Sequence, residues 1–314
     1  MSIQNKDTLK GYFQTGDKPT QSQFGDLIDT LGASFSLYNS TISSDNNTDI
    51  VLRGSTNSVS YWASLIGQIP NLDDDYAGSS IATDGSNIYI IGGNTSDSQA
   101  LIIKLDANGN VIWQKEVVEN SFGECIIFNN NYLWLFYSDY GDDGGISIIQ
   151  MDTTGNEIGN WNFTTDVYTA FGYEIDVDEN NNVYFVGYQN NGTAQQICIG
   201  KLNTTTSNID WVFNMGDVNG EEGLGIKYSN GFVYTTGYAS NGFSNIAVIN
   251  KMDTNGNLIW SKSSNIAASA LTITVDTTGN VYVGGTDDNT NGLLFALDSN
   301  GNKLYCKKIN VSRA

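Results

Sequence analysis

Residues 276–285, DTTGNVYVGG, contain the pattern that decides the fold of this 314-residue chain. Asp, Thr, Gly and Asn at 276–280 are typical of a tight turn, because they hydrogen-bond to their own backbone or accept a positive φ. The residues that follow, Val281, Tyr282 and Val283, favour a strand that ends at a Gly-Gly pair. The stretch therefore predicts the turn and second strand of a β-hairpin.

Related stretches recur along the chain in five units of about 48 residues. In each unit a first hairpin ends near Gly-Gly or Gly-Tyr, and a second carries a turn such as Asp-x-x-Gly-Asn and then an aromatic residue. That aromatic residue recurs at intervals of 48, 50, 49 and 45 residues, as Trp113, Trp161, Trp211, Trp260 and Tyr305. Such a period, with four short strands a unit, predicts a mainly β protein, a β-propeller of four-stranded blades.

A further half-unit precedes these five. Residues 49–67, DIVLRGSTNSVSYWASLIG, align with a second hairpin, and Trp62 lies 51 residues before Trp113. The chain thus contains five first hairpins and six second hairpins. We expect five blades, each complete without the extra hairpin, and six blades with one incomplete is the alternative.

The repeats resemble the SBBP-type and PQQ-like β-propeller repeats. Those repeats contain D-x-x-G-N-V-Y-V-x-G followed by K-L-D-x-x-G-x-x-x-W, and the resemblance covers roughly residues 79–308. The second unit departs from the pattern, with NNNYLWLF in place of the Asp-Gly turn. The resemblance implies a fold more than a function, since propellers include enzymes, lectins and scaffolds.

The charge of the chain excludes several functions. With 34 acidic and 14 basic residues the net charge is −20, which repels the phosphates of nucleic acid and of anionic lipid. No apolar run approaches the roughly 20 residues of a membrane span, and the N-terminus has no apolar leader segment. We expect neither a nucleic-acid partner nor a membrane span.

The chain contains no histidine and three widely separated cysteines, Cys125, Cys198 and Cys306. Zinc sites of the Cys-His type and Ser-His-Asp nucleophiles are thereby excluded. We expect the cysteines to be buried free thiols, and we expect no cofactor.

The repeated aromatic residues could stack on a ligand, but their fixed places in the strands favour packing between neighbouring blades. This interpretation covers Trp113, Trp161, Trp211, Trp260, Tyr89, Tyr184, Tyr234 and Tyr282.

The stretch DVDENNNVY, 176–184, offers oxygen atoms at alternating positions and invites a calcium-loop interpretation. It lacks the glycine and the distal glutamate of an EF-hand, and it aligns with the ordinary first-hairpin turn of the other units. We expect a turn and no metal.

A four-stranded meander places the short turns at one end of the propeller and the long, dissimilar loops at the other. Those long loops are rich in Asn, Asp, Ser, Thr, Gly and Tyr, a composition suited to sugars or to a protein surface. We expect any ligand to bind at that end, with candidate contacts at Tyr140, Asp142, Asp143, Tyr168, Tyr188, Asn190, Tyr238, Asn241, Phe243 and Asp287.

An enzyme is the alternative from a different class. Carboxylates such as Asp73, Asp74, Asp75, Glu221 and Glu222 could work as an acid–base pair, as in a glycosidase. No nucleophile motif accompanies them, and the chain has only two arginines, Arg53 and Arg313. We therefore expect a non-enzymatic protein without catalytic residues.

The N-terminal residues 20–31, TQSQFGDLIDTL, have a helical pattern. Thr20 and Gln23 form a capping box, and Gly32 is a suitable stop. Helices this short are marginal in water, so their apolar residues need a partner. We expect docking or self-association through Leu9, Tyr12, Phe13, Phe24, Leu27, Ile28 and Leu31.

The same region, LKGYFQTGDKPTQSQFGDLIDTL, is similar to an L-K-x-x-F-x-T-G-x-x-P-T-x-x-x-F-x-D-L-I-D-S segment near the N-termini of bacteriophage structural proteins, including tail and head fibres. The resemblance covers about 24 residues. It implies a virion protein whose N-terminus docks on the particle, and so on other virion proteins, while its C-terminal domain projects outward. We expect the propeller to contact a host surface glycan, another virion protein or nothing specific. The expected organisation is a helical attachment segment at 1–38, a polar linker at 39–49 and a β-propeller at 50–314.

Overall fold

The computed structural model describes residues 76–94, 99–118, 121–139, 145–163, 170–190, 192, 194–216, 220–240, 242–287 and 291–309. The chain divides into two compact units, 1–65 and 66–314, and every described residue belongs to the second. The predicted attachment segment, its docking residues from Leu9 to Leu31, the linker and the hairpin at 49–67 all lie outside the described residues. In the described part the secondary structure consists of β-strands.

Those strands form five four-stranded antiparallel blades, which confirms the predicted fold. Blade 1 contains β1 (Tyr76–Thr83), β2 (Asn87–Asn94), β3 (Gln99–Asp106) and β4 (Val111–Val118). Blade 2 contains β5 (Ser121–Asn129), β6 (Tyr132–Asp139), β7 (Gly145–Asp152) and β8 (Glu157–Phe163). Blade 3 contains β9 (Ala170–Val177), β10 (Val183–Asn190), β11 (Gln195–Asn203) and β12 (Asn208–Met215).

Blades 4 and 5 share one long strand. Blade 4 contains β13 (Glu221–Ser229), β14 (Phe232–Ser240), β15 (Asn245–Asp253) and the first part of β16 (Leu258–Val275). The second part of β16 pairs with β17 (Val281–Asp287), and β18 (Gly292–Leu297) and β19 (Lys303–Ile309) complete blade 5. The chain thus passes from one blade to the next within a single strand.

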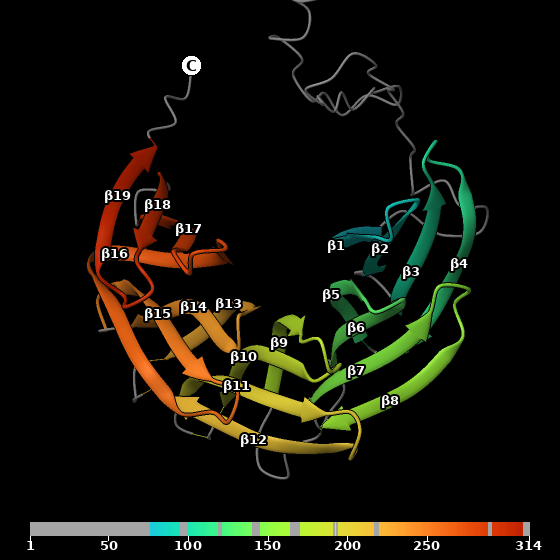
Figure 1. Ribbon diagram of the computed structural model, residues 1–314, viewed down its shortest axis with the longest axis horizontal. Coiled ribbons are helices and arrows are strands. Elements are labelled where there is room, and N and C mark those ends of the chain that lie inside the picture. The colour runs from blue at the N-terminus through green and yellow to red at the C-terminus, as the bar shows by residue number, and fades with distance from the viewer. Residues whose placement is uncertain are drawn as a thin grey trace, which may run out of the picture. The chain divides into compact units, whose positions relative to one another are not determined.

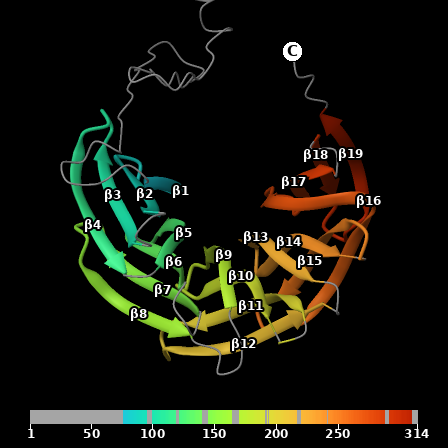
Figure 2. The ribbon, with the colours of Figure 1, turned by 180° about the vertical axis from the view of Figure 1, so that it is seen from behind.

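Successive blades lie side by side in an arc (Figure 1). The first strands β1, β5, β9 and β13 lie toward the inside of the arc, and the last strands β4, β8, β12 and β19 lie along its outer rim. The reverse view shows the same order (Figure 2). Every first strand therefore faces a common centre.

The Asp-x-x-Gly-Asn turns form as predicted, because the aspartate satisfies the turn backbone. The Asp106 carboxylate accepts the N–H groups of Asn108 and Asn110 at 2.8 and 2.9 Å. Gly109 takes a φ of 82°, which a residue with a side chain rarely adopts. The same arrangement recurs at Asp152, Asp253, Asp276 and Asp298.

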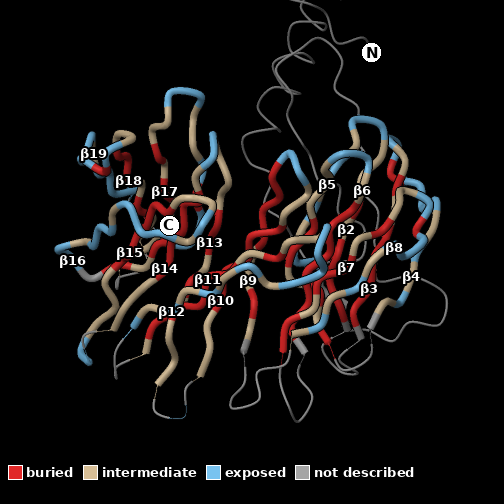
Figure 3. The backbone as a smooth tube through the Cα atoms, turned by 60° about the horizontal axis from the view of Figure 1, so that its bottom comes forward, coloured by how far each residue is buried: buried red, intermediate tan, exposed pale blue. Residues whose placement is uncertain are grey.

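Neighbouring blades are joined by the repeated aromatic and lysine residues. Tyr89, Tyr184 and Tyr234 are buried in the clusters that fill the blade interfaces. The indole N–H of Trp211 donates to the carbonyl of Thr254 in the next blade at 3.0 Å, and Lys104 Nζ donates to the carbonyl of Thr153 at 2.9 Å. The predicted packing between neighbouring blades is therefore confirmed for Tyr89, Tyr184, Tyr234 and Trp211. Figure 3 shows that the buried residues lie along the strands and that exposed residues lie at many of the turns.

Tyr282 of blade 5 differs from its equivalents. It is only half-buried, although it donates to Asp276 just as Tyr184 donates to Asp178. Blades 1 and 5 stand at the two ends of the series, and the described residues show no interface between them like those between the other successive blades. The structure describes five blades, as expected.

Two expectations from composition have clear outcomes. Cys125 and Cys198 are buried free thiols, but Cys306 is exposed, because it lies on the outermost strand of blade 5. Among the described residues, no helix has the length and apolar character needed to cross a membrane.

Candidate functional site

Each of the five innermost strands contains a β-bulge at the same place. In β5, Gly123 and Cys125 pair with consecutive residues of β6, which leaves Glu124 as the extra residue. In β9 the extra residue is Tyr173, by the same register shift. The equivalent extra residues in β1, β13 and β16 are Ser79, Leu224 and Leu271. A bulge re-aims the side chain that it contains, and bulges are common next to functional sites.

A small residue precedes every bulge, and at Gly123, Gly172 and Gly223 the preceding blade approaches closely. A Cβ on Gly172 would lie 2.0 Å from Cζ of Phe136, which belongs to the preceding blade. A Cβ on Gly123 would lie 2.4 Å from Cγ1 of Ile91 in the same relation. The glycines thus let each innermost strand pack closely against its neighbour and bring the bulges to one centre.

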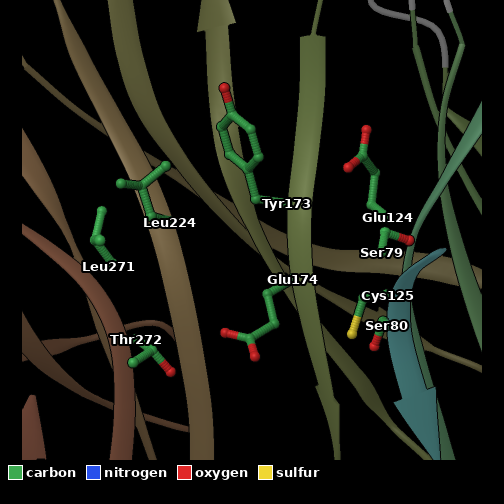
Figure 4. A pocket seen from close by; sticks show the side chains of 9 residues that line it. All are labelled: Ser79, Ser80, Glu124, Cys125, Tyr173, Glu174, Leu224, Leu271 and Thr272. Atoms are coloured by element: carbon green, nitrogen blue, oxygen red, sulfur yellow. The ribbon is translucent and has the colours of Figure 1, made fainter. Parts of the chain in front are cut away.

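The bulges surround one open pocket of about 190 Å³. Its lining comes from all five innermost strands: Ser79, Ser80, Glu124, Cys125, Tyr173, Glu174, Leu224, Leu271 and Thr272. Figure 4 shows that the side chains of Glu124 and Tyr173 extend toward one end of this pocket, whereas those of Glu174 and Cys125 extend toward the other. Five residues that are about 50 positions apart in sequence are thereby brought together.

Glu174 is a pocket carboxyl group with a strongly perturbed pKa. Its Oε2 accepts the backbone N–H of Ile226 in the next blade at 2.8 Å. Burial raises the pKa of the carboxyl from 4.5 to about 7, and this hydrogen bond and Lys227 oppose the rise only in part. Glu174 can therefore carry or release a proton near neutral pH.

A tyrosine network adjoins the pocket between blades 3 and 4. The Tyr173 O–H donates to Glu222 Oε2 at 3.0 Å, and Tyr238 also hydrogen-bonds to Glu222. The Tyr188 ring lies 5.9 Å from that of Tyr173. Burial and the Glu222 carboxylate raise the pKa of all three tyrosines, so they remain neutral donors and acceptors.

The chemistry of the pocket is that of a polar, acceptor-rich cavity with one apolar side. It contains two carboxylates, a tyrosine and three hydroxyl side chains, but no lysine or arginine among its lining residues. Such a cavity suits a ligand with many hydroxyl or N–H donors.

The predicted ligand-face residues have mixed outcomes. Tyr188 and Tyr238 come together at Glu222, as described above. Asn190 accepts the N–H of Gly192 in its own turn at 3.0 Å, and Asp287 forms an ion pair with Lys308 at 2.6 Å. Phe243 is fully exposed. The other candidates, Tyr140, Asp142, Asp143, Tyr168 and Asn241, lie outside the described residues.

The calcium-loop alternative at 176–184 gains no support from the geometry. The Asp178 carboxylate accepts the N–H groups of Asn180 and Asn182 at 2.9 and 2.8 Å, as in the other turns. Asp176 instead pairs with Lys227 at 2.7 Å. In the part of the chain that the structure describes, no group of three or more acidic, Cys or His residues is arranged to hold a metal.

Sequence reasoning predicted none of the pocket residues as ligand contacts, although a signal was present. The innermost strands contain a small residue, two variable residues and an isoleucine, as in GSSI, GECI, GYEI, GLGI and ALTI. The residues at these two variable positions, other than Gly225, are the ones that line the pocket. Variation inside a strict repeat, and not its constant aromatic residues, would have indicated the site.

Comparisons with known proteins give information about the fold alone. No known protein family matches the sequence, and no curated protein matches it. A protein of unknown function from Bacteroides caccae has a similar structure, with a TM-score of 0.51 and 10% identity over 76% of this chain and 83% of that one. The periplasmic gluconolactonase of Pseudomonas aeruginosa also has a similar structure, with a TM-score of 0.54 and 10% identity over 75% of this chain and 73% of that one. At this identity the likeness shows a shared β-propeller scaffold and nothing of function.

Proposed function

We propose that this protein is a non-enzymatic structural protein of a bacteriophage particle, which docks through residues 1–38 and displays a β-propeller that binds host surface glycan. The observation that carries the binding role is the pocket, where five equivalent bulges present four kinds of side chain: serine, glutamate, tyrosine and, twice, leucine. The positions that pack between blades are instead occupied by the constant residues Tyr89, Tyr184 and Tyr234. The similarity of the N-terminal segment to phage structural proteins supports the docking role.

The docking role is tested with two full-length variants. Phe24→Asp combined with Leu27→Asp places charge in the predicted apolar stripe, whereas Ser22→Asp places charge on its opposite side. We expect the double variant to lose co-sedimentation with purified virion components and the Ser22→Asp variant to keep it. Equal co-sedimentation of both variants would refute docking through this stripe.

A second candidate function is hydrolysis of a glycan, and one observation favours it. Glu174, with its pKa raised to about 7, lines the same pocket as Glu124 of the neighbouring blade. Most glycosidases use two carboxyl groups, one as the acid and one as the base or nucleophile. Release of reducing ends from host polysaccharide, lost in both Glu124→Gln and Glu174→Gln, would favour the enzyme. Binding without release of reducing ends would favour the structural protein.

A further inference from the structure

From the composition and shape of the pocket, we infer that it receives a single uncharged sugar residue, whose apolar face lies on Leu224 and Leu271 and whose hydroxyls meet Glu124 and Tyr173. This inference rests on the proposed glycan-binding function. It adds the position of the site, the class of sugar and the residues that select it.

The pocket has two unlike walls. Figure 4 shows Leu224 and Leu271, from β13 and β16, on one side, Glu124 of β5 on the opposite side, and Tyr173 of β9 between them. Leu271 is 45% exposed, so its apolar surface is available to a ligand. A pyranose ring has C–H groups on its faces and hydroxyls around its rim, and it matches this division.

The polar wall is built to accept hydrogen bonds. A carboxylate such as that of Glu124 only accepts, and the Tyr173 oxygen can accept because its proton is donated to Glu222. The Ser79 hydroxyl likewise lies within donating distance of the backbone carbonyls of Ile91 and Gly123 and keeps an acceptor site. A ligand rich in hydroxyl donors satisfies this wall.

The charges oppose an anionic sugar. The pocket lining includes two glutamates and no cationic side chain, and Lys227 of β13 is engaged with Asp176 at 2.7 Å. A uronate or sialate would bring a third carboxylate into a pocket of a chain with a net charge of −20. An uncharged sugar avoids that repulsion.

The size of the pocket limits how much of a glycan enters. Its volume of about 190 Å³ is smaller than the roughly 300 Å³ at which pockets for drug-sized ligands begin. One ring can enter, and the rest of a longer glycan stays outside. The pocket thus recognises the terminal residue of the glycan.

The test uses the full-length protein and a panel of simple sugars. D-glucose, D-galactose, D-mannose, N-acetyl-D-glucosamine and D-glucuronate are titrated with ligand-observed NMR as the readout. We expect binding of at least one uncharged sugar and no binding of glucuronate. Glu124→Gln should weaken binding by roughly tenfold or more, because a hydrogen bond to a charged group is lost.

Matched controls separate the pocket from the rest of the surface. Leu271→Asp and Leu258→Asp each place a carboxylate on β16, at residues that are 45% and 41% exposed. Glu157→Gln changes an exposed glutamate of β8. We expect Leu271→Asp to abolish binding, and Leu258→Asp and Glu157→Gln to leave it unchanged, with unfolding curves confirming that each variant is folded.

Three outcomes would overturn the inference: no uncharged sugar binds, glucuronate binds best, or binding survives both pocket variants. In the last case the protein would still bind glycan, but outside this pocket, and the proposed function would stand without this site. Loss of virion docking would count against the proposed function and would leave a sugar-binding pocket intact.

Discussion

The Glu174 carboxylate of β9 accepts the N–H of Ile226 in β13 at 2.8 Å, so a titratable side chain joins blade 3 to blade 4. Its pKa is raised to about 7, mainly because burial disfavours the charged form. Between the ordinary value of 4.5 and about 7, the folded protein holds a proton that the unfolded chain has released. Stability from this group is therefore present below pH 4.5 and falls as the pH rises toward 7.

Glu174→Gln should remove this pH dependence while keeping an oxygen that accepts from Ile226. We expect the variant to be more stable than the wild type at pH 8 by about 1 to 2 kcal/mol, after allowance for partial solvent screening, and nearly equal to it at about pH 4.5. Urea unfolding at the two pH values measures the difference. Parallel pH profiles for the two proteins would contradict the prediction.

Tyr184 and Tyr282 occupy equivalent places but have different surroundings. Tyr184 is 0% exposed beneath the next blade, and Tyr282 is half-buried at the end of the described series. Tyr184→Ala should cost about 3 to 5 kcal/mol of unfolding free energy, and Tyr282→Ala about 1 to 2 kcal/mol, because less packing is lost. Both variants lose the same hydrogen bond to an aspartate, so chemical unfolding isolates the effect of burial. Equal losses would show that the two tyrosines are equally covered in solution.

Gly172 should not tolerate a methyl group. A Cβ there would lie 2.0 Å from the Phe136 ring, whereas a Cβ on Gly292 meets nothing nearer than 3.5 Å. We expect Gly172→Ala to lower the melting temperature, with a cost of roughly 1 to 3 kcal/mol, and Gly292→Ala to be close to neutral. Equal melting temperatures for the two variants would contradict the close approach of the blades at Gly172.

Only one of the three cysteines should react in the folded protein. Burial raises the pKa of the Cys125 and Cys198 thiols to about 12, so thiolate is scarce at these positions, and Cys306 is exposed. Titration with a thiol reagent near neutral pH should modify one thiol in the native protein and three in denaturant. Mass spectrometry of the peptides would identify Cys306, and early labelling at Cys125 would contradict the packing of β5.

The repeat could be predicted from sequence because each of its parts is local. A turn such as 276–280 and the strand that follows are specified by residues that are neighbours in the chain. The packing role of Tyr89, Tyr184 and Tyr234 could be predicted too, because large aromatic residues at a fixed period fill interfaces. The net charge and the absence of histidine, which follow from composition alone, also limited the possible chemistry.

The pocket could not be predicted in the same way. Glu124 and Tyr173 look like ordinary strand residues until a register shift turns them toward the centre of the blades. The prediction instead favoured the loop end, and of its ten residues only Tyr188 and Tyr238 meet at one place among those described.

The sequence by itself determined the blade: its four strands, its turns and the aromatic residues on its faces, since these follow from patterns within about 50 residues. Only the tertiary structure decided which residues of different blades meet, because contact between Glu174 and Ile226, or exposure of Tyr282 against burial of Tyr184, depends on which blade lies alongside. The same local sequence therefore has different surroundings in successive blades, and the candidate site arises where five of them converge.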